Sequence, residues 1–209
     1  EGTSFSSPMA AGATVVIRDY FNDVALLATP SAALMKATLI AGAKDIGYGF
    51  VSSNQNPQAT GAAYNYTNCG RNIQGWGLMD IRQSLSPKAP YNWSYSDNAE
   101  LSTGGSVALP ITIADANVPL RVVLVWSDPP GTAGSAAKQL RNDLDLTVTQ
   151  GANTWRGNDY ATTYNQGRYT VLNGSYRDDL NNVDVVTIKP GTPLVAGAAT
   201  LTINGFNVP

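Results

Sequence analysis

The sequence predicts a mainly helical N-terminal part followed by an all-β sandwich. Residues 4–17 carry no charge and are small or apolar, which is typical of a buried helix. Beyond about residue 97, short alternating segments are separated by turn residues, as in a β-sandwich. Between the two, Ser86-Pro-Lys-Ala-Pro90 places two prolines in a linker. We therefore expect a first part at 1–86, a linker at 87–96 and a sandwich at 97–209.

Three helices are expected in the first part. The first contains the uncharged run 4–17 and should reach the surface where charge returns at Arg18, Asp19 and Asp23. Pro8 lies in its first turn, where a missing N–H is tolerated. The second spans 30–43, with Thr29 as its N-cap. A short amphipathic helix begins near Asp80. Both long helices are apolar on most sides, so we expect them to be covered.

The second part is expected to be built from five strands. The alternating segments are 106–114, 120–127, 144–149, 183–189 and 198–204. Residues 47–75 and 150–182 are rich in Gly, Asn and Tyr and are expected to form loops. Pro129-Pro-Gly131 and Lys189-Pro-Gly191 are expected to be turns.

Composition restricts the classes of partner. Charged residues make up 13% of the 209, about half of the usual ~25%. The net charge is −2 and basic residues do not cluster, so a nucleic-acid partner is not expected. The longest apolar runs are far below the ~20 residues that span a bilayer. Few charges among many small polar residues predict a secreted, β-rich protein.

The first twelve residues carry the strongest chemical signal. The pattern Gly-Thr-Ser-x-Ser-x-Pro-x-x-Ala-Gly begins at Gly2 and places Ser4 where an apolar helix begins. Free backbone N–H groups and the positive end of a helix stabilise a developing oxyanion. A serine hydroxyl also needs a base, and the chain contains no histidine. The alternative is that Ser4 simply caps a buried helix.

This pattern, with Gly75-Trp-Gly-Leu-Met-Asp80 about 70 residues later, resembles the C-terminal third of a subtilisin-like catalytic domain (subtilase, peptidase family S8). Phe5 and Ser6 stand where that family usually has Met and Ala. The resemblance implies an α/β catalytic domain, of which this chain holds the mainly helical C-terminal part. It implies that Ser4 is the nucleophile, and that the Ser4 N–H and Thr3 form part of the oxyanion hole. The catalytic His and Asp would lie upstream, so this chain alone is predicted to be inactive.

The second part strengthens the resemblance. Leu124-Val-Trp-Ser-Asp128, Asn142-Asp-Leu-Asp-Leu146, Gly157-Asn-Asp159 and Asn181-Asn-Val-Asp184 are similar to segments of the jelly-roll or β-barrel domain of secreted alkaline subtilases. The resemblance thus covers nearly the whole chain. It implies a last strand beyond residue 209, so we expect the chain to be truncated at both ends.

A cluster of aspartates suggests a calcium site. Asp143 and Asp145 project from one face of a strand, and Asp159 or Asp128 could approach from neighbouring strands. Calcium takes six to eight oxygen ligands, and the resemblance also implies calcium. The alternative is a solvated polar face. The carboxylate pair could also suggest a glycoside hydrolase, but nothing else in the sequence supports one.

The function predicted is that of a secreted serine endopeptidase acting on protein or peptide substrates. Its partner would be the missing N-terminal catalytic segment or a companion chain. The alternatives are a non-catalytic binding or stabilising β-sandwich fragment and an inactive subtilase homologue.

Several residues leave smaller questions open. Tyr91, Trp93 and Tyr95 form either a packed patch between the parts or, less favoured, a sugar platform. Cys69 is a free thiol or pairs outside the chain. Three Asn-x-Ser/Thr sequons either carry glycans or arise by chance. They begin at Asn65, Asn92 and Asn173.

Overall fold

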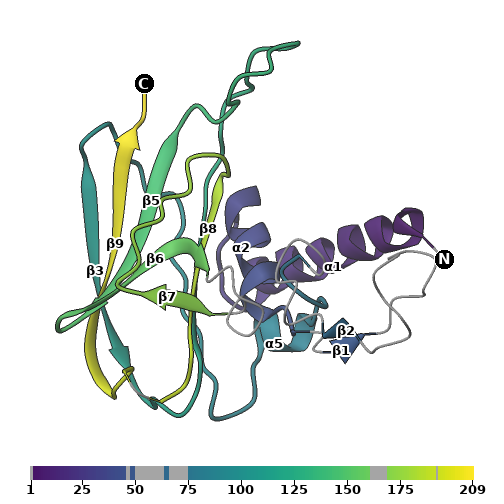
Figure 1. Cartoon of the computed structure of the whole chain (residues 1–209). Coiled ribbons are helices and arrows are strands. Elements are labelled where there is room, and N and C mark those ends of the chain that lie inside the picture. The colour runs from purple at the N-terminus through teal and green to yellow at the C-terminus, as the bar shows by residue number, and fades with distance from the viewer. Residues whose placement is uncertain (1, 46–47, 50–63, 66–74, 161–168, 192) are drawn as a thin grey trace.

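The computed structural model describes residues 2–45, 48–49, 64–65, 75–160, 169–191 and 193–209. The strands pair into antiparallel sheets and outnumber the helices, which lie at one side (Figure 1). The elements form three layers: a five-stranded sheet, a two-stranded sheet against it, and the helices. The chain is thus a β-rich protein, and its assignment as subtilisin-like α/β or jelly roll stays a prediction.

The five-stranded sheet is antiparallel throughout, in the order β3-β9-β5-β6-β7. Its strands are β3 (Ser106–Ile113), β5 (Asp143–Gln150), β6 (Asn153–Tyr160), β7 (Thr170–Leu172) and β9 (Gly197–Asn207). The second sheet pairs β4 (Leu120–Val125) with β8 (Val183–Ile188). A ribbon of β1 (Tyr48–Gly49) and β2 (Tyr64–Asn65) lies apart from both.

Strand β8 is the centre of the layered structure because all six of its residues are buried. Val186 and Ile188 join the core shared with the five-stranded sheet. Val183 and Val185 point the other way and pack with Ile40 of helix α2. This two-sided burial follows from the alternation of side chains along a strand. The β4–β8 pair therefore joins the helices to the larger sheet.

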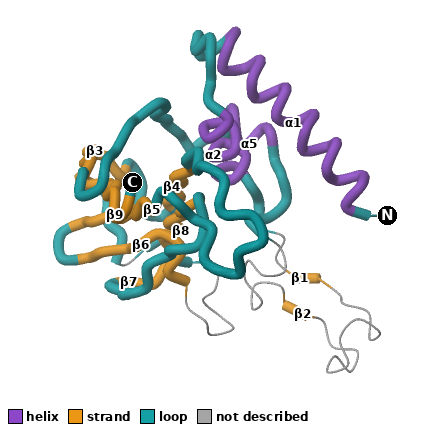
Figure 2. Tube along the Cα trace, turned by 90° about the horizontal axis from the view of Figure 1, so that it is seen from above, coloured by secondary structure: helices purple, strands orange, loops and turns teal. Residues whose placement is uncertain are grey.

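Three helices are present in the described residues: α1 (Thr3–Asp23), α2 (Ala32–Gly42) and α5 (Ile81–Leu85). Ile17 and Phe21 of α1 are fully buried against Leu34 and Leu85. Figure 2 shows α1 running past α2 and α5, with its N-terminal end away from them. None of these helices is long and apolar enough to cross a membrane.

Helix α2 is held at both ends by charged side chains from later in the chain. At its N-terminus the Asp97 carboxylate accepts hydrogen bonds from the Ser31 amide (2.9 Å) and hydroxyl (2.5 Å). At its C-terminus Arg121 Nη1 donates to the carbonyls of Ile40 (3.2 Å) and Ala43 (2.6 Å). A negative charge at the N-terminus and a positive charge at the C-terminus both complement the helix dipole.

Two of the three linker aromatics pack, as the favoured interpretation predicted, but their ring contacts are with the helices and not with the strands. Trp93 and Tyr95 contact the Phe21 ring, with centroids 6.0 and 5.0 Å apart. Trp93 Nε1 also donates to the Leu85 carbonyl at 3.1 Å. Tyr91 is exposed. The linker therefore packs against α1 and α5. The boundaries 1–86, 87–96 and 97–209 stay predictions.

The five predicted strands are confirmed, but the loop predicted at 150–182 is wrong in part. Strands β6 and β7 lie there. Strand β6 lacks an apolar alternation because Gly157 and Asp159 are buried beside Trp155. A Cβ at Gly157 would overlap the Asp184 carboxylate, so only a glycine fits that position. Most of the predicted loop at 47–75 lies outside the described residues.

Two helix predictions also need correction. Helix α2 begins at Ala32, and its N-cap is Ser31 rather than Thr29, because the Ser31 hydroxyl accepts from the Leu34 amide at 2.9 Å. The first helix runs on to Asp23, through the charged residues expected at its surface end, but its N-terminal half is exposed in the described chain rather than covered. The short helix near Asp80 is confirmed, with Asp80 accepting from the Gln83 amide.

Replacing Asp97 by alanine should destabilise the chain. Asp97→Ala removes two hydrogen bonds to the helix α2 N-terminus, so we expect the free energy of unfolding to fall by about 1–2 kcal/mol. Urea unfolding followed by tryptophan fluorescence measures the change. Glu100→Ala removes an exposed acid from the same segment and is the control, with an expected change below about 0.5 kcal/mol. Equal effects of the two variants would contradict the role of Asp97.

Candidate functional site

Ser4 lies in the first turn of α1 and is exposed. The helix begins at Thr3, with Gly2 as its N-cap. Glycine has no side chain to cap a helix, and the φ of 157° at Gly2 is one that other residues rarely adopt. Helices α2 and α5 are capped by Ser31 and Asp80. Among the described helices, α1 is therefore the one whose first turn lacks a side-chain cap.

The uncapped turn leaves backbone donors beside the Ser4 hydroxyl. The Phe5 amide donates to the Gly2 carbonyl at 3.1 Å. The first amides of a helix have no partner within the helix, and those of Thr3 and Ser4 belong to this group. Such donors at the positive end of a helix suit a negatively charged oxygen. This arrangement can bind an anion or an oxyanion next to a serine hydroxyl.

The described chain does not supply a base for Ser4. The whole sequence contains no histidine. Within the described ranges no side chain forms a hydrogen bond with the Ser4 hydroxyl. A serine without a base is a poor nucleophile, so the described residues form only part of a catalytic site.

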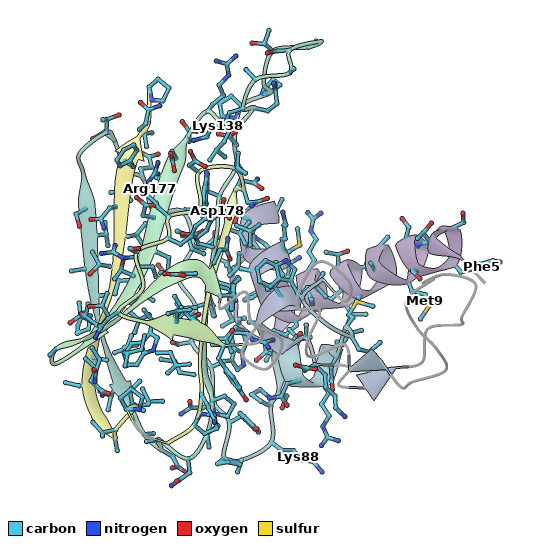
Figure 3. The ribbon with its side chains drawn as sticks, viewed as in Figure 1. Phe5, Met9, Lys88, Lys138, Arg177 and Asp178 are labelled. Carbon is cyan, nitrogen blue, oxygen red and sulfur yellow. The ribbon has the colours of Figure 1, made fainter. Side chains whose placement is uncertain are left out.

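The helix that carries Ser4 presents an uncovered apolar face. Phe5 is 69% exposed and Met9 is 67% exposed, and both lie at the free end of α1 (Figure 3). Val16 is also exposed, and the spacing of these residues places them on one side of the helix. The buried residues Ala13, Ile17 and Phe21 lie on another side. Large exposed apolar side chains gathered on one helix face mark a contact surface.

The predicted metal ligands lie on the β-rich half of the molecule, away from Ser4. Figure 3 shows Arg177 and Asp178 on this half and Phe5 and Met9 at the end of α1. Asp143 and Asp145 do share one side of β5, as the alternation predicted. Arg177 Nη1 lies 2.8 Å from Asp143 Oδ2 and 3.6 Å from Asp145 Oδ1. Lys138 Nζ adds a contact of 3.3 Å to Asp143.

These contacts do not fit a calcium site. Cations of the protein already neutralise Asp143, and the hydrogen bond to it raises the pKa of Arg177. Burial raises the pKa of Asp145, which opposes the charged form that calcium prefers. Asp159 instead accepts a hydrogen bond from the Tyr176 amide at 3.1 Å. The described residues contain no group of three or more His, Cys, Asp or Glu arranged to hold a metal. Calcium binding by the whole protein stays a prediction.

Asp128, the fourth candidate ligand, has a structural role. Its two carboxylate oxygens accept from the Arg141 amide (2.9 Å) and the Asn142 amide (2.6 Å). These bonds close the long loop between β4 and β5 at its base.

A buried acidic network that the sequence did not reveal lies beside β6 and β8. Asn158 Nδ2 donates to Asp178 Oδ2 (2.7 Å), to Asp184 Oδ1 (3.1 Å) and to the Val183 carbonyl (2.6 Å). Asp184 also accepts from the Leu146 amide at 2.9 Å. Burial raises the pKa of Asp184 to about 7, and the charges of Asp178 and Asp145 add to the effect. The available sequence signal was the polar triplet Gly157-Asn-Asp159, whose Asn158 has a left-handed backbone in the structure (φ 56°).

The raised pKa predicts that stability falls as the pH rises from about 4 to about 7. The folded chain keeps a proton on Asp184 in this window, whereas the unfolded chain has released it above its ordinary pKa of 3.8. The expected loss is at most about 4 kcal/mol, from about 1.36 kcal/mol per pKa unit. Urea unfolding at a series of pH values measures it.

Asp184→Asn is the matched variant for this prediction, because it keeps an oxygen for the Leu146 amide but cannot ionise. We expect the slope between pH 4 and 7 to be smaller in this variant than in the unmodified chain. Parallel pH profiles for the two chains would show that Asp184 does not titrate in this window.

Comparison with known proteins connects the chain to protease-named relatives. No protein-family model matches the chain. Two Dictyostelium discoideum proteins, named "Serine protease/ABC transporter B family protein" tagD and tagB, are each 27% identical to it over its whole length. The chain spans only 13% and 12% of their lengths. It is thus similar to a small portion of much larger proteins, which suggests a protease-related family.

Proposed function

We propose that the chain is the C-terminal part of a subtilisin-like serine endopeptidase in which Ser4 is the nucleophile. The observation that carries this proposal is the exposed Ser4 in the uncapped first turn of a 21-residue helix. The motif around Ser4 supports it, as do the relatives named serine protease.

In the proposed reaction the Ser4 hydroxyl attacks a peptide carbonyl. A histidine upstream of this chain takes the hydroxyl proton and later gives it to the leaving amine, and an upstream aspartate orients that histidine. The carbonyl oxygen becomes an oxyanion beside the backbone N–H of Ser4, with Thr3 assisting. Water then hydrolyses the acyl-enzyme. The residues of this chain supply the nucleophile and part of the oxyanion hole.

The exposed face of α1 supports the proposed partner, which is an upstream segment or a companion chain. Phe5, Met9 and Val16 need a cover, since exposed apolar groups of this size favour burial by about 1.5–3 kcal/mol each. The same cover would bring the missing base to Ser4. Secretion of the whole protein is also a proposal, and it rests on the low charge and on the resemblance.

The β-rich half has a stabilising role in this proposal. Asp97 and Arg121 hold α2, and α2 packs against α1 through Leu34. The sandwich therefore supports the helix that carries the nucleophile. A stabilising sandwich without any catalysis is the alternative, and the variant below separates the two.

Ser4→Ala in the full-length protein should abolish peptide hydrolysis. We expect kcat to fall by about a millionfold, as when the serine of a triad is removed. Labelling by a fluorophosphonate probe, followed by mass mapping of the labelled peptide, should disappear as well. Ser6→Ala changes another exposed serine two residues on and should keep both signals. Labelling retained in the Ser4→Ala protein would overturn the assignment.

Met9→Glu should have opposite effects in the two forms of the protein. In the chain alone it removes an exposed apolar group, so we expect less self-association by light scattering. In the full-length protein it places a charge at a buried contact, so we expect a loss of about 3 kcal/mol or more of stability.

Val195→Glu is the control, because Val195 is an exposed apolar residue of the β-rich half. It should have a small effect in both forms. If Met9→Glu were equally harmless in the full-length protein, the proposed cover over α1 would be wrong.

A further inference from the structure

One sequence motif that catalysis does not use is the sequon Asn173-Gly174-Ser175. Asn173 directly follows β7, which ends at Leu172. In the order β3-β9-β5-β6-β7, strand β7 is an edge of the five-stranded sheet. Asn173 and Ser175 are both exposed.

The contacts of Asn173 fix its side chain with the amide nitrogen available. The Asn173 N–H donates to the Thr154 carbonyl at 2.7 Å, and its Oδ1 accepts from the Thr154 amide at 2.9 Å. The backbone is left-handed (φ 53°), as in a turn. No described residue accepts a hydrogen bond from Asn173 Nδ2. The oxygen therefore anchors the side chain to β6 while the nitrogen stays open.

The glycine of the sequon fits its surroundings closely. A Cβ at Gly174 would overlap the Asp159 carboxylate, and Asp159 also accepts from the Tyr176 amide. The turn after Asn173 is thus fixed against a buried acid, which leaves Asn173 and Ser175 on the outside.

We propose that Asn173 is the acceptor of an N-linked glycan. In this step Asn173 Nδ2 attacks the anomeric carbon of a lipid-linked oligosaccharide held by an oligosaccharyltransferase. A carbon–nitrogen bond forms, the carbon–oxygen bond to the lipid diphosphate breaks, and the amide loses one proton to a base of the transferase. The proposal rests on the secretion proposed above, because the transferase works in the secretory pathway.

A glycan at Asn173 has a physical use in this fold. Edge strands expose unpaired backbone groups and invite association with other chains. Leu172 and Tyr176 flank the sequon and are exposed apolar or aromatic residues. A bulky, solvated glycan between them would cover this edge.

The sequon at Asn92 is less suited to carry a glycan, and the sequon at Asn65 extends into residues that the structure does not describe. In Asn92-Trp93-Ser94 the Asn and Ser are exposed as well, but the middle residue is packed against Phe21 and bonded to Leu85, and no described contact orients the Asn92 amide. The side chain of Asn65 is not among those described. The structure thus favours Asn173.

The test is mass spectrometry of the full-length protein purified from the cells that make it. We expect the proteolytic peptide containing Asn173 to carry a hexose and N-acetylhexosamine mass that peptide N-glycosidase removes. Intact glycopeptides are measured because an Asn-Gly amide can also hydrolyse without an enzyme. Finding this peptide only in unmodified form would overturn the proposal.

Matched variants exclude a folding artefact. Ser175→Ala destroys the sequon and leaves Asn173 in place, whereas Ser175→Thr preserves the sequon. Produced by the same cells, the first should lose the glycan and the second should keep it. A glycan at Asn173 in the Ser175→Ala protein would contradict the assignment.

Fluorophosphonate labelling of the same sample separates this proposal from the catalytic one. Labelled protein without a glycan at Asn173 overturns the glycan alone. Glycosylated protein without a label at Ser4 overturns the catalytic role alone.

Discussion

The two ends of helix α2 are held by opposite charges, and the two other described helices, α1 and α5, pack against α2. Asp97 bonds to Ser31 at the N-terminus, and Arg121 bonds to three carbonyls at the C-terminus. Burial lowers the pKa of Arg121, so this cation is held at a cost in desolvation. The carbonyls offset that cost because their partial negative charge adds to that of the helix end. Helix α2 is thereby fixed on the β4–β8 pair.

This constraint extends to Ser4 through packing. Helix α1 contacts the rest of the protein through Ile17 and Phe21, which lie in its C-terminal half. Its N-terminal half projects from the molecule (Figure 1), and Phe5 and Met9 on this half are exposed. The described chain therefore supports one end of α1 and leaves the end with Ser4 exposed. This arrangement agrees with the proposal that Ser4 lies in this chain and the catalytic His and Asp lie upstream, because the end of α1 that carries Ser4 is exposed and uncapped.

The sequence was sufficient where local patterns determine the structure and insufficient where distant residues do. The strands with apolar alternation, such as β4 and β8, were predicted within a few residues, and so was the helix capped by Asp80. Strand β6 was missed because a buried glycine and a buried aspartate interrupt its apolar pattern. The cap of α2 was misplaced because Asp97, which supports Ser31, lies 66 residues away. At the site, the motif predicted Ser4 at a helix start. The sequence could not predict that Arg177 forms an ion pair with Asp143, since the two residues are 34 positions apart.

Native-state hydrogen exchange of the chain tests the central claim that α2 and the sandwich form one cooperative unit. Amides buried in α2, such as that of Ile40, and in β8, such as that of Val185, should open with the same free energy. Arg121→Gln should lower both values together. If α2 exchanged far faster than β8, or if Arg121→Gln affected only α2, the two parts would unfold separately and the account would be contradicted.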